Sequence, residues 1–283
     1  MFRRLYSQTS RTCINGFAMI KEEPVESVSA LIDCLNGFPN NFVYRGHADA
    51  QWKLESSLER IIGEHWSGES ASKFEEFSLM EFQSKFHLYD RENVQPASKL
   101  AWLSIMQHYG VPTRLLDFTS SPYVALYFAL ESYNPQTKSD FAVYALDYAA
   151  ILDKSIHYIS SRDAAFHETR ATIHQQQDKV FDEVVDRFSY DIAWVAEPQL
   201  LNARLDRQAG SFLLSGNREL QIETVLDSAI YHGAHMTKFR ISGALYEGIF
   251  ALLRKMNLTS KSLYGDLDGL ARSIRMSMHV YSV

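Results

Sequence analysis

The tripeptide Tyr44-Arg45-Gly46 is the first group in the sequence with the chemistry of a binding site. The run from Phe42 to Arg45 is aromatic and β-branched and is bounded by Asn40-Asn41 and Gly46, so it predicts a short strand that ends near Arg45. A guanidinium in such a position can bind phosphate or carboxylate oxygens in pairs. The alternative interpretation is an ion-paired surface arginine without a ligand.

A second candidate binding group is the hydroxyl triplet Thr119-Ser120-Ser121, which follows a run of apolar residues and Asp117. Ser121 suits the N-cap of a helix, and Pro122 suits its first position. The residues from Val124 to Leu130 are apolar on all sides, which is typical of a buried helix. Free N–H groups and the positive end of the helix dipole meet at such a terminus, so we expect it to hold an anion or a carboxamide.

Other titratable side chains have a structural interpretation beside the functional one. His108 ends a predicted helix and suits either a proton carrier or a group that caps the helix. Arg114 and Asp117, three residues apart, favour a structural ion pair. His232 and His235 lack the further ligands that zinc requires, so no metal site is predicted.

The composition excludes a disordered chain and broad binding to polyanions. The 283 residues are 46% hydrophobic, and 28 Lys and Arg stand against 34 Asp and Glu, for a formal charge of −6. No apolar run is long enough to span a bilayer, so no membrane association is expected. Two cysteines make no disulfide framework, and we expect a cytoplasmic protein. The basic segment from Thr237 to Val283 leaves direct binding to RNA or DNA open.

Hydrophobic spacing predicts helices mixed with strands. The predicted helices cover residues 25–36, 70–92, 102–109, 122–130 and 242–256, with a short last helix from Asp266, and the predicted strands cover residues 42–45, 141–146, 209–214, 220–226 and 238–241. In the strand 220–226, Glu219, Gln221 and Glu223 share one face. The aromatic residues of 70–92 are expected in the core, as are Trp52 and Trp102.

These elements predict an α+β protein with a mixed, partly antiparallel sheet split around a cleft. A helical subdomain is expected from about residue 58 to residue 109. Residues 1–24 form an N-terminal extension, and no linker divides residues 25–283, which we expect to be one domain.

Several motifs resemble the FRG domain family. The motifs are Tyr44-Arg45-Gly46, Trp52-x-Leu54 with Ser57-Leu58-x-Arg60, and the run from Gln107 to Asp117, followed downstream by the segments Asn202–Phe212, Gly248-Ile249 and Leu263–Ala271. The family takes its name from Phe-Arg-Gly, and here tyrosine replaces the phenylalanine. The resemblance implies an FRG domain over residues 25–283.

The order of the motifs also resembles that of ADP-ribosyltransferases, which implies an ADP-ribosyltransferase-like split sheet. An aromatic-Arg-Gly strand end comes first in that superfamily, then a hydroxyl triplet before a helix, then a glutamate on a later strand. Gln208 stands where that glutamate is expected, and Glu219 and Glu223 follow it. The resemblance implies catalytic roles for Arg45, Gln208 and Glu223. It also implies that Tyr44, Arg45, Gly46, Thr119, Ser120 and Ser121 bind NAD.

The function expected from these resemblances is transfer of ADP-ribose from NAD to a macromolecule. Cleavage of the nicotinamide bond develops positive charge on the ribose, which a carboxylate stabilises, while an arginine holds the pyrophosphate. NAD is a co-substrate, and no metal is required. The acceptor is a protein, RNA or DNA, and a toxin or phage-defence effector of this kind is expected to have a neutralising antitoxin partner. The alternative is a non-catalytic nucleotide- or protein-binding module of the FRG family, because a cleft without an acid binds a nucleotide but catalyses poorly.

Overall fold

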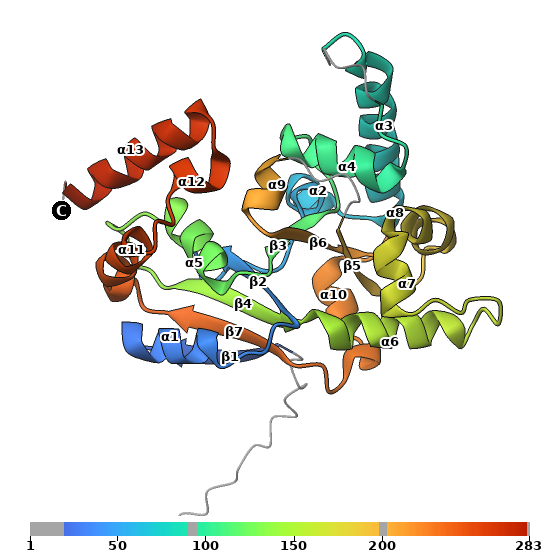
Figure 1. The fold of residues 1–283 in the computed structure, drawn as a ribbon. Helices are drawn as coiled ribbons and strands as arrows, with labels where there is room; N and C mark the ends of the chain where they lie inside the picture. The colour runs from blue at the N-terminus through green and yellow to red at the C-terminus, as the bar shows by residue number, and fades with distance from the viewer. Residues whose placement is uncertain (1–19, 90–94, 198–202, 282–283) are drawn as a thin grey trace, which may run out of the picture.

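The computed structural model describes residues 20–89, 95–197 and 203–281, and within them seven strands form one mixed sheet (Figure 1). The strands are β1 (Lys21–Val25), β2 (Phe42–His47), β3 (Leu116–Thr119), β4 (Phe141–Asp147), β5 (Ala193–Ala196), β6 (Gly210–Ser215) and β7 (Met236–Ile241). Their order in the sheet is β1-β7-β4-β2-β3-β6-β5. Only the β1–β7 pair is parallel among these strands. The expected α+β class with a mixed sheet is confirmed.

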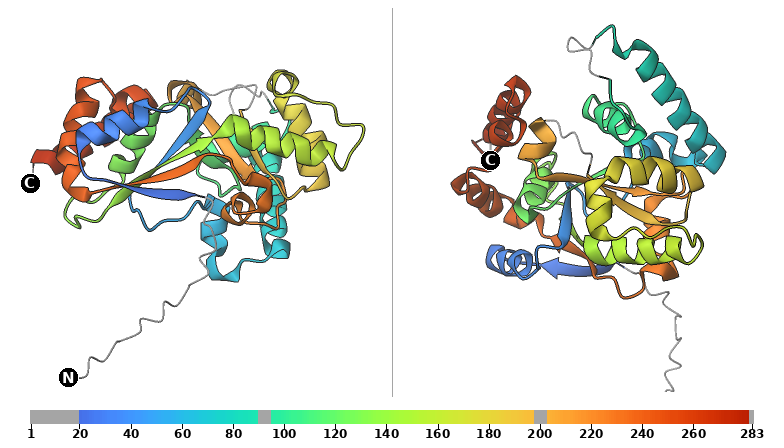
Figure 2. Two further views of the ribbon diagram at one scale, coloured as in Figure 1. Left: turned by 90° about the horizontal axis from the view of Figure 1, so that it is seen from below. Right: turned by 45° about the vertical axis from the view of Figure 1, so that its right-hand side comes forward.

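Helices surround this sheet (Figure 2). They are α1 (Val28–Asn36), α2 (Ser57–Ile62), α3 (Gly68–Phe86), α4 (Lys99–His108), α5 (Pro122–Glu131), α6 (Tyr148–Ser160), α7 (Arg170–Gln175), α8 (Gln177–Val180), α9 (Ala203–Arg207), α10 (Ile222–Leu226), α11 (Tyr246–Lys255), α12 (Ser260–Tyr264) and α13 (Leu267–Tyr281). A π-helical turn, Phe181–Asp186, follows α8, and three short 3-10 turns cover Gly63–His65, Ala229–Tyr231 and Gly243–Leu245. Helices α2, α3 and α4 occupy the range in which the helical subdomain was expected.

The sheet is joined at its centre by a single residue pair. Strand β2 pairs with β4 along its whole length, from Phe42 to His47, but with β3 only through Tyr44 and Thr119. Strand β3 in turn pairs with β6 from Leu116 to Thr119. The half β1-β7-β4-β2 and the half β3-β6-β5 therefore separate immediately after Tyr44, and Arg45 is the first residue of β2 beyond the junction.

Helix α5 packs against β2 and β4, and α11 packs on α5. A Cβ atom built on Gly46 would lie 1.9 Å from the carbonyl oxygen of Ala125 and 2.6 Å from the amide nitrogen of Ala129. Only a glycine lets the strand and the helix approach so closely. The glycine after Arg45 is thus required by packing, in addition to any role in exposing backbone groups to a ligand.

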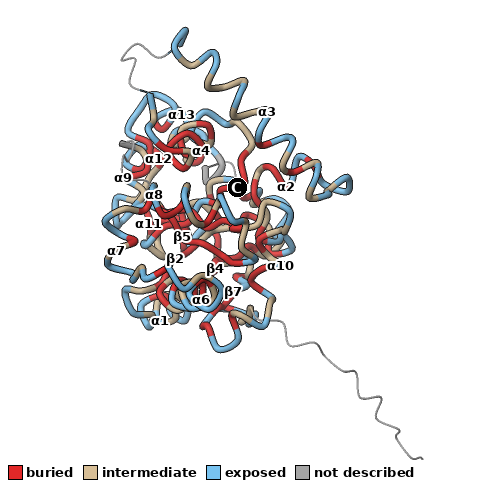
Figure 3. Tube along the Cα trace, turned by 90° about the vertical axis from the view of Figure 1, so that its right-hand side faces the viewer, coloured by how far each residue is buried: buried red, intermediate tan, exposed pale blue. Residues whose placement is uncertain are grey.

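The core is divided by the sheet into three apolar clusters. One lies between α5, α11 and one face of β2, β4 and β7. The second lies on the opposite face of the sheet, where it extends across both halves and is covered by α10. The third fills the space between α4, α6, the segment from α7 to the π-helical turn, and β5 and β6. Buried positions follow the strands, whereas α3 is exposed along most of its length (Figure 3).

Several expectations from the sequence are wrong in detail. Residues Lys21–Val25, assigned mostly to the N-terminal extension, form the edge strand β1. In the range 220–226, where a strand was expected, residues Ile222–Leu226 form helix α10. Two aromatic residues of α3, Phe74 and Phe77, are exposed instead of lying in the core, and so is Trp52, whose side chain is 53% exposed. In the part of the chain that the structure describes, no helix is long and apolar enough to cross a bilayer.

Arg114 does not pair with Asp117, contrary to expectation. It is 6% exposed and forms ion pairs with Glu75 of α3 and Asp186 of the π-helical turn. Lys99 at the start of α4 joins the same two acids, at 3.1 and 3.0 Å. Burial alone would raise the pKa of Asp186, but Arg114 and Lys99 hold it below its ordinary value. The cluster ties the helical subdomain to the rest of the fold.

Replacement of Arg114 by methionine is expected to lower the free energy of unfolding by about 3 kcal/mol, because it leaves the buried Glu75 short of one partner. A carboxyl group with a lowered pKa stabilises the fold above its unfolded pKa and loses that contribution as pH falls through the folded value. Urea unfolding of the wild type should therefore show an acid-side loss of stability below about pH 4 that is smaller in Arg114→Met. Arg170→Ala, which breaks the exposed pair with Asp153, should change stability by less than about 1 kcal/mol. Equal stability of Arg114→Met and the wild type would contradict this role.

Candidate functional site

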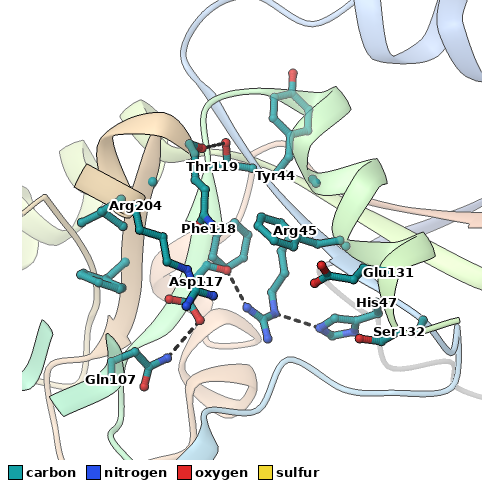
Figure 4. Close-up of a pocket in the computed structure, with 18 of the residues that line it drawn as sticks. Tyr44, Arg45, His47, Gln107, Asp117, Phe118, Thr119, Glu131, Ser132 and Arg204 are labelled. Atoms are coloured by element: carbon teal, nitrogen blue, oxygen red, sulfur yellow. Dashed lines mark hydrogen bonds between the residues drawn. The ribbon is translucent and has the colours of Figure 1, made fainter. Parts of the chain in front are cut away.

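A cavity of about 550 Å³ opens where the two halves of the sheet separate (Figure 4). This volume lies within the range of small-molecule and cofactor sites. Its walls come from β2, the segment after β2, α2, α4, β3, one side of α5, α9, the start of β6 and α12. Segments far apart in the sequence thus meet around Arg45, whose guanidinium points into the space between β2 and β3 (Figure 4).

Arg45 is held by two neutral acceptors. Its Nε donates to Nε2 of His47, at 3.0 Å, and its Nη1 donates to the carbonyl oxygen of Asp117, at 2.6 Å. Arg45 and His47 are two residues apart on β2, so both side chains lie on one face of the strand. Among the described residues, no carboxylate lies within ion-pair distance of the Arg45 guanidinium. The cavity therefore contains a cation whose charge no direct ion pair neutralises.

The pKa shifts of Arg45 and His47 agree with the hydrogen bond between them. Burial lowers the pKa of Arg45 to about 10, while the negative charge of Asp117 opposes the shift and the positive charge of Arg60 adds to it. Burial, with the charge of Arg45 next, lowers the pKa of His47 to about 3. His47 is thus neutral at physiological pH, and because its Nε2 accepts from Arg45, its proton lies on Nδ1.

Asp117 is the acid that faces Arg45 across the cavity. Its side chain is exposed, and Oδ2 accepts a hydrogen bond from Nε2 of Gln107, at 3.0 Å. Gln107 is fixed in turn, because its Oε1 accepts from the Thr113 hydroxyl at 2.7 Å. A polar chain from α4 therefore sets the position of this carboxylate (Figure 4).

Only part of the hydroxyl triplet lines the cavity. Thr119 does so, and its hydroxyl donates to the carbonyl oxygen of Gln208, at 2.6 Å. The Thr119 hydroxyl also accepts from the Ser121 amide, and the Ser121 hydroxyl accepts from the Val124 amide as the N-cap of α5. The amide of Ser120 donates to Ala209. The amides of Ser120, Ser121 and Val124 thus donate within the protein, and Ser120 and Ser121 lie outside the cavity lining.

Of the other residues expected from the resemblance, some line the cavity and others do not. Gln208 lines it, and its side-chain amide donates to the carbonyl oxygen of Leu263, at 3.4 Å. Tyr44 and Gly46 also line it, although the Tyr44 ring points away from Arg45 (Figure 4). Glu219 lies against Gly68 at the start of α3, outside the lining. Glu223 lies in α10 beside Lys53 and Leu54, also outside the lining.

Helices α5, α9 and α12 form a second polar wall of the cavity, which the sequence did not indicate. The Arg204 guanidinium lies over the Tyr264 ring, at 4.4 Å from the ring centroid. The Tyr264 hydroxyl donates to Oε2 of Glu131, at 2.6 Å, and the Tyr127 hydroxyl donates to Oε1, at 2.9 Å. Glu131 is also within 3.7 Å of Arg272. This acid lines the cavity, but its oxygens are already occupied. Arg204 stood in a quoted motif, whereas nothing local in the sequence distinguished Glu131 from any other helix-ending glutamate.

One comparison with known proteins finds a family match, and it covers the part of the chain that contains Arg45. Residues 40–138 match the FRG domain family. No curated protein and no solved structure matches the chain. The matched segment includes β2, the helices α2 to α4, β3 and α5, and it ends before Arg204 and Gln208. The chain therefore carries an FRG domain, which supplies Arg45, His47, Gln107 and Asp117 to the cavity.

Proposed function

We propose that the cavity binds NAD and that the protein is an NAD-dependent ADP-ribosyltransferase acting on a macromolecule. The observation that carries the proposal is Arg45 itself, a cation held in the cavity by a carbonyl and a neutral histidine, without a carboxylate in ion-pair distance among the described residues. An anionic ligand would supply the missing negative charge. The pyrophosphate of NAD is such a ligand, and arginine binds it bidentately.

The arrangement of the cavity supports a dinucleotide in particular. Arg45 and Arg204 lie on opposite walls (Figure 4), so a ligand with two phosphates can contact both. Gln208 lies two residues before β6, and its carbonyl oxygen accepts a hydrogen bond from Thr119 of β3. Its place in the chain follows the order of the ADP-ribosyltransferase motifs. A sheet that separates into two halves around the site is also consistent with an ADP-ribosyltransferase-like fold.

In the proposed reaction the bond between the anomeric carbon and the nicotinamide nitrogen breaks, and its electron pair goes to the nicotinamide ring, which becomes neutral. A nucleophile of the acceptor forms the new bond to the anomeric carbon and loses its proton to a carboxylate or to water. Asp117 is the residue placed for the carboxylate role, because it is exposed to the cavity and oriented by Gln107. Its negative charge stabilises the positive charge that develops on the ribose.

Replacement of Asp117 by asparagine is expected to lower the rate of ADP-ribose transfer by about 100-fold and to change NAD affinity much less. The asparagine keeps the size of the side chain and the main-chain carbonyl that holds Arg45. Single-turnover transfer of labelled ADP-ribose and calorimetric binding of NAD separate the two effects. Asp163→Asn, at a half-buried loop position outside the cavity lining, is the matched control and should leave both values unchanged. An unaltered transfer rate in Asp117→Asn would exclude Asp117 as the acid.

A non-catalytic nucleotide-binding module is the second candidate, and a specific observation favours it. Both glutamates expected to supply the acid, Glu219 and Glu223, lie outside the cavity lining. Incubation of the purified protein with labelled NAD and with separated protein, RNA and DNA fractions of a cell extract distinguishes the candidates. Transfer of label to one fraction with release of nicotinamide supports the transferase. Binding of NAD with neither product supports the binding module.

A further inference from the structure

An exposed tryptophan stands at the edge of the same cavity. Trp52 is 53% exposed and lines the cavity, whereas Trp102 and Trp194 are buried. Its backbone is fixed on both sides. The Trp52 carbonyl oxygen accepts a hydrogen bond from the Tyr144 hydroxyl, at 3.1 Å, and Leu54, two residues later, is buried. The indole is therefore held at the cavity edge with much of its surface open to solvent, where a planar ligand can contact it.

The indole is close to the arginine that the proposed function uses. Its ring lies 6.1 Å from the His47 ring in an edge-to-face contact, and His47 accepts the hydrogen bond of Arg45. The three groups thus follow one another along one wall of the cavity. A ligand whose phosphates contact Arg45 has a planar base within reach of Trp52.

A second cation comes from the same segment. Arg60 of α2 lines the cavity, and its Nη1 donates to the carbonyl oxygen of Glu55, at 2.6 Å. Its charge lowers the pKa of both Arg45 and His47, after the larger effect of burial, so the two guanidinium groups repel each other. An anion placed between Arg45 and Arg60 would remove this repulsion.

We infer that the segment Trp52–Arg60 completes the ligand site: the Trp52 indole stacks on an aromatic base of the dinucleotide, and Arg60 shares its phosphates with Arg45. This inference rests on the proposed function. It assigns a ligand contact to residues that the ADP-ribosyltransferase motifs do not include. Stacking on a tryptophan binds a base through its π face, so the contact recognises the flat ring, and the phosphates fix its position.

Tryptophan fluorescence tests the stacking contact directly. NAD is expected to quench the emission of the wild type, because the base covers an exposed indole. Trp52→Phe should keep NAD affinity within about threefold and lose the quenching, and Trp52→Ala should bind NAD about 10-fold more weakly by calorimetry. Trp66→Phe, in the small cluster under α2, is the control and should retain both quenching and affinity. Titration with AMP and with nicotinamide mononucleotide shows which base stacks, since only the ligand that carries that base quenches.

A substitution of Arg60 tests the proposed phosphate contact. Arg60→Gln should weaken NAD binding roughly tenfold and reduce its dependence on salt, whereas Arg275→Gln, at an exposed position of α13, should change neither. Suppose that the wild type binds NAD and that this binding requires Arg45. If Trp52→Ala and Arg60→Gln then bind NAD as tightly as the wild type, and NAD still quenches Trp52→Phe, the inference is wrong and the proposed function stands. If NAD does not bind the wild type, both are wrong.

Discussion

Replacement of Arg45 by alanine should weaken NAD binding by about 100-fold or more and abolish ADP-ribose transfer, in a protein that remains folded. Truncation of a buried charged group that contacts a charged ligand typically costs about 2–5 kcal/mol of binding free energy. Arg45 donates only to His47 and the Asp117 carbonyl, so its removal deletes no ion pair within the described fold. Calorimetric titration of NAD measures the affinity, and circular dichroism with urea unfolding verifies the fold.

Arg45→Lys separates charge from geometry. A lysine keeps the positive charge but has no planar fork of donors, so it cannot bond His47, the Asp117 carbonyl and a phosphate together. We expect it to recover part of the binding and little of the transfer. An Arg45→Ala protein that is folded and binds NAD as tightly as the wild type would show that the cavity has been assigned to the wrong ligand.

Replacement of Gly46 by alanine is expected to lower the free energy of unfolding by about 3 kcal/mol, because the new methyl group would collide with the backbone of α5. The nearest atoms, the Ala125 carbonyl oxygen and the Ala129 amide nitrogen, are backbone atoms of a buried helix and have no rotamer that removes the clash. Helix α5 also carries Phe128 and Glu131 of the cavity wall, so NAD binding should weaken as well. Urea unfolding gives the stability.

Gly248→Ala is the matched control for this prediction. A Cβ at Gly248 would meet only Cγ2 of Val28, at 3.1 Å, and alanine has the higher helix propensity in α11. We expect its stability to stay within about 1 kcal/mol of the wild type. If Gly46→Ala is as stable as Gly248→Ala, the close packing of α5 on β2 is not a requirement of this fold.

The sequence predicted the elements whose signals are local. The strand that ends near Arg45, the buried strand β4 and the N-cap and proline that begin α5 were all read from residue type and spacing. The order of the motifs singled out Gln208, and in the structure its carbonyl oxygen accepts a hydrogen bond from the Thr119 hydroxyl. These features depend on short segments, each of which carries its own pattern.

The sequence-based predictions were wrong in two situations. In one, a short apolar pattern fits both a strand and a helix; in the other, the position of a side chain depends on residues far away in the sequence. Ile222, Val225 and Leu226 suit an alternating strand in part, but they also have the spacing of one helix face, and α10 buries all three. Arg114 pairs with Glu75 and Asp186, which lie 39 and 72 residues away in the sequence, so no local rule indicates the partners. The exposure of Trp52 likewise depends on how the two halves of the sheet separate.

The sequence singled out Arg45, which lines the cavity, but it gave no indication that Asp117 lines it too. Arg45 is the middle residue of a tripeptide with a specific pattern, whereas any carboxylate on a neighbouring element suits the proposed role of the acid. Asp117 was assigned to an ion pair with Arg114, and the structure places it in the cavity instead, oriented by Gln107. The separation of β2 from β3 after a single residue pair decides which acids face Arg45, and pairing of this kind is a property of the whole sheet.

Transfer of ADP-ribose from two NAD samples, each labelled in a different half of the molecule, tests the central claim most directly. One NAD sample is labelled in the adenylate phosphate and a second in the nicotinamide, and each is incubated with the wild-type protein and a cell extract. We expect the phosphate label to become covalently attached to macromolecules while the nicotinamide label is released in equal amount, and both signals to disappear with Arg45→Ala. Absence of both signals from the wild type, together with no calorimetric binding of NAD, would contradict the assignment of this cavity to NAD.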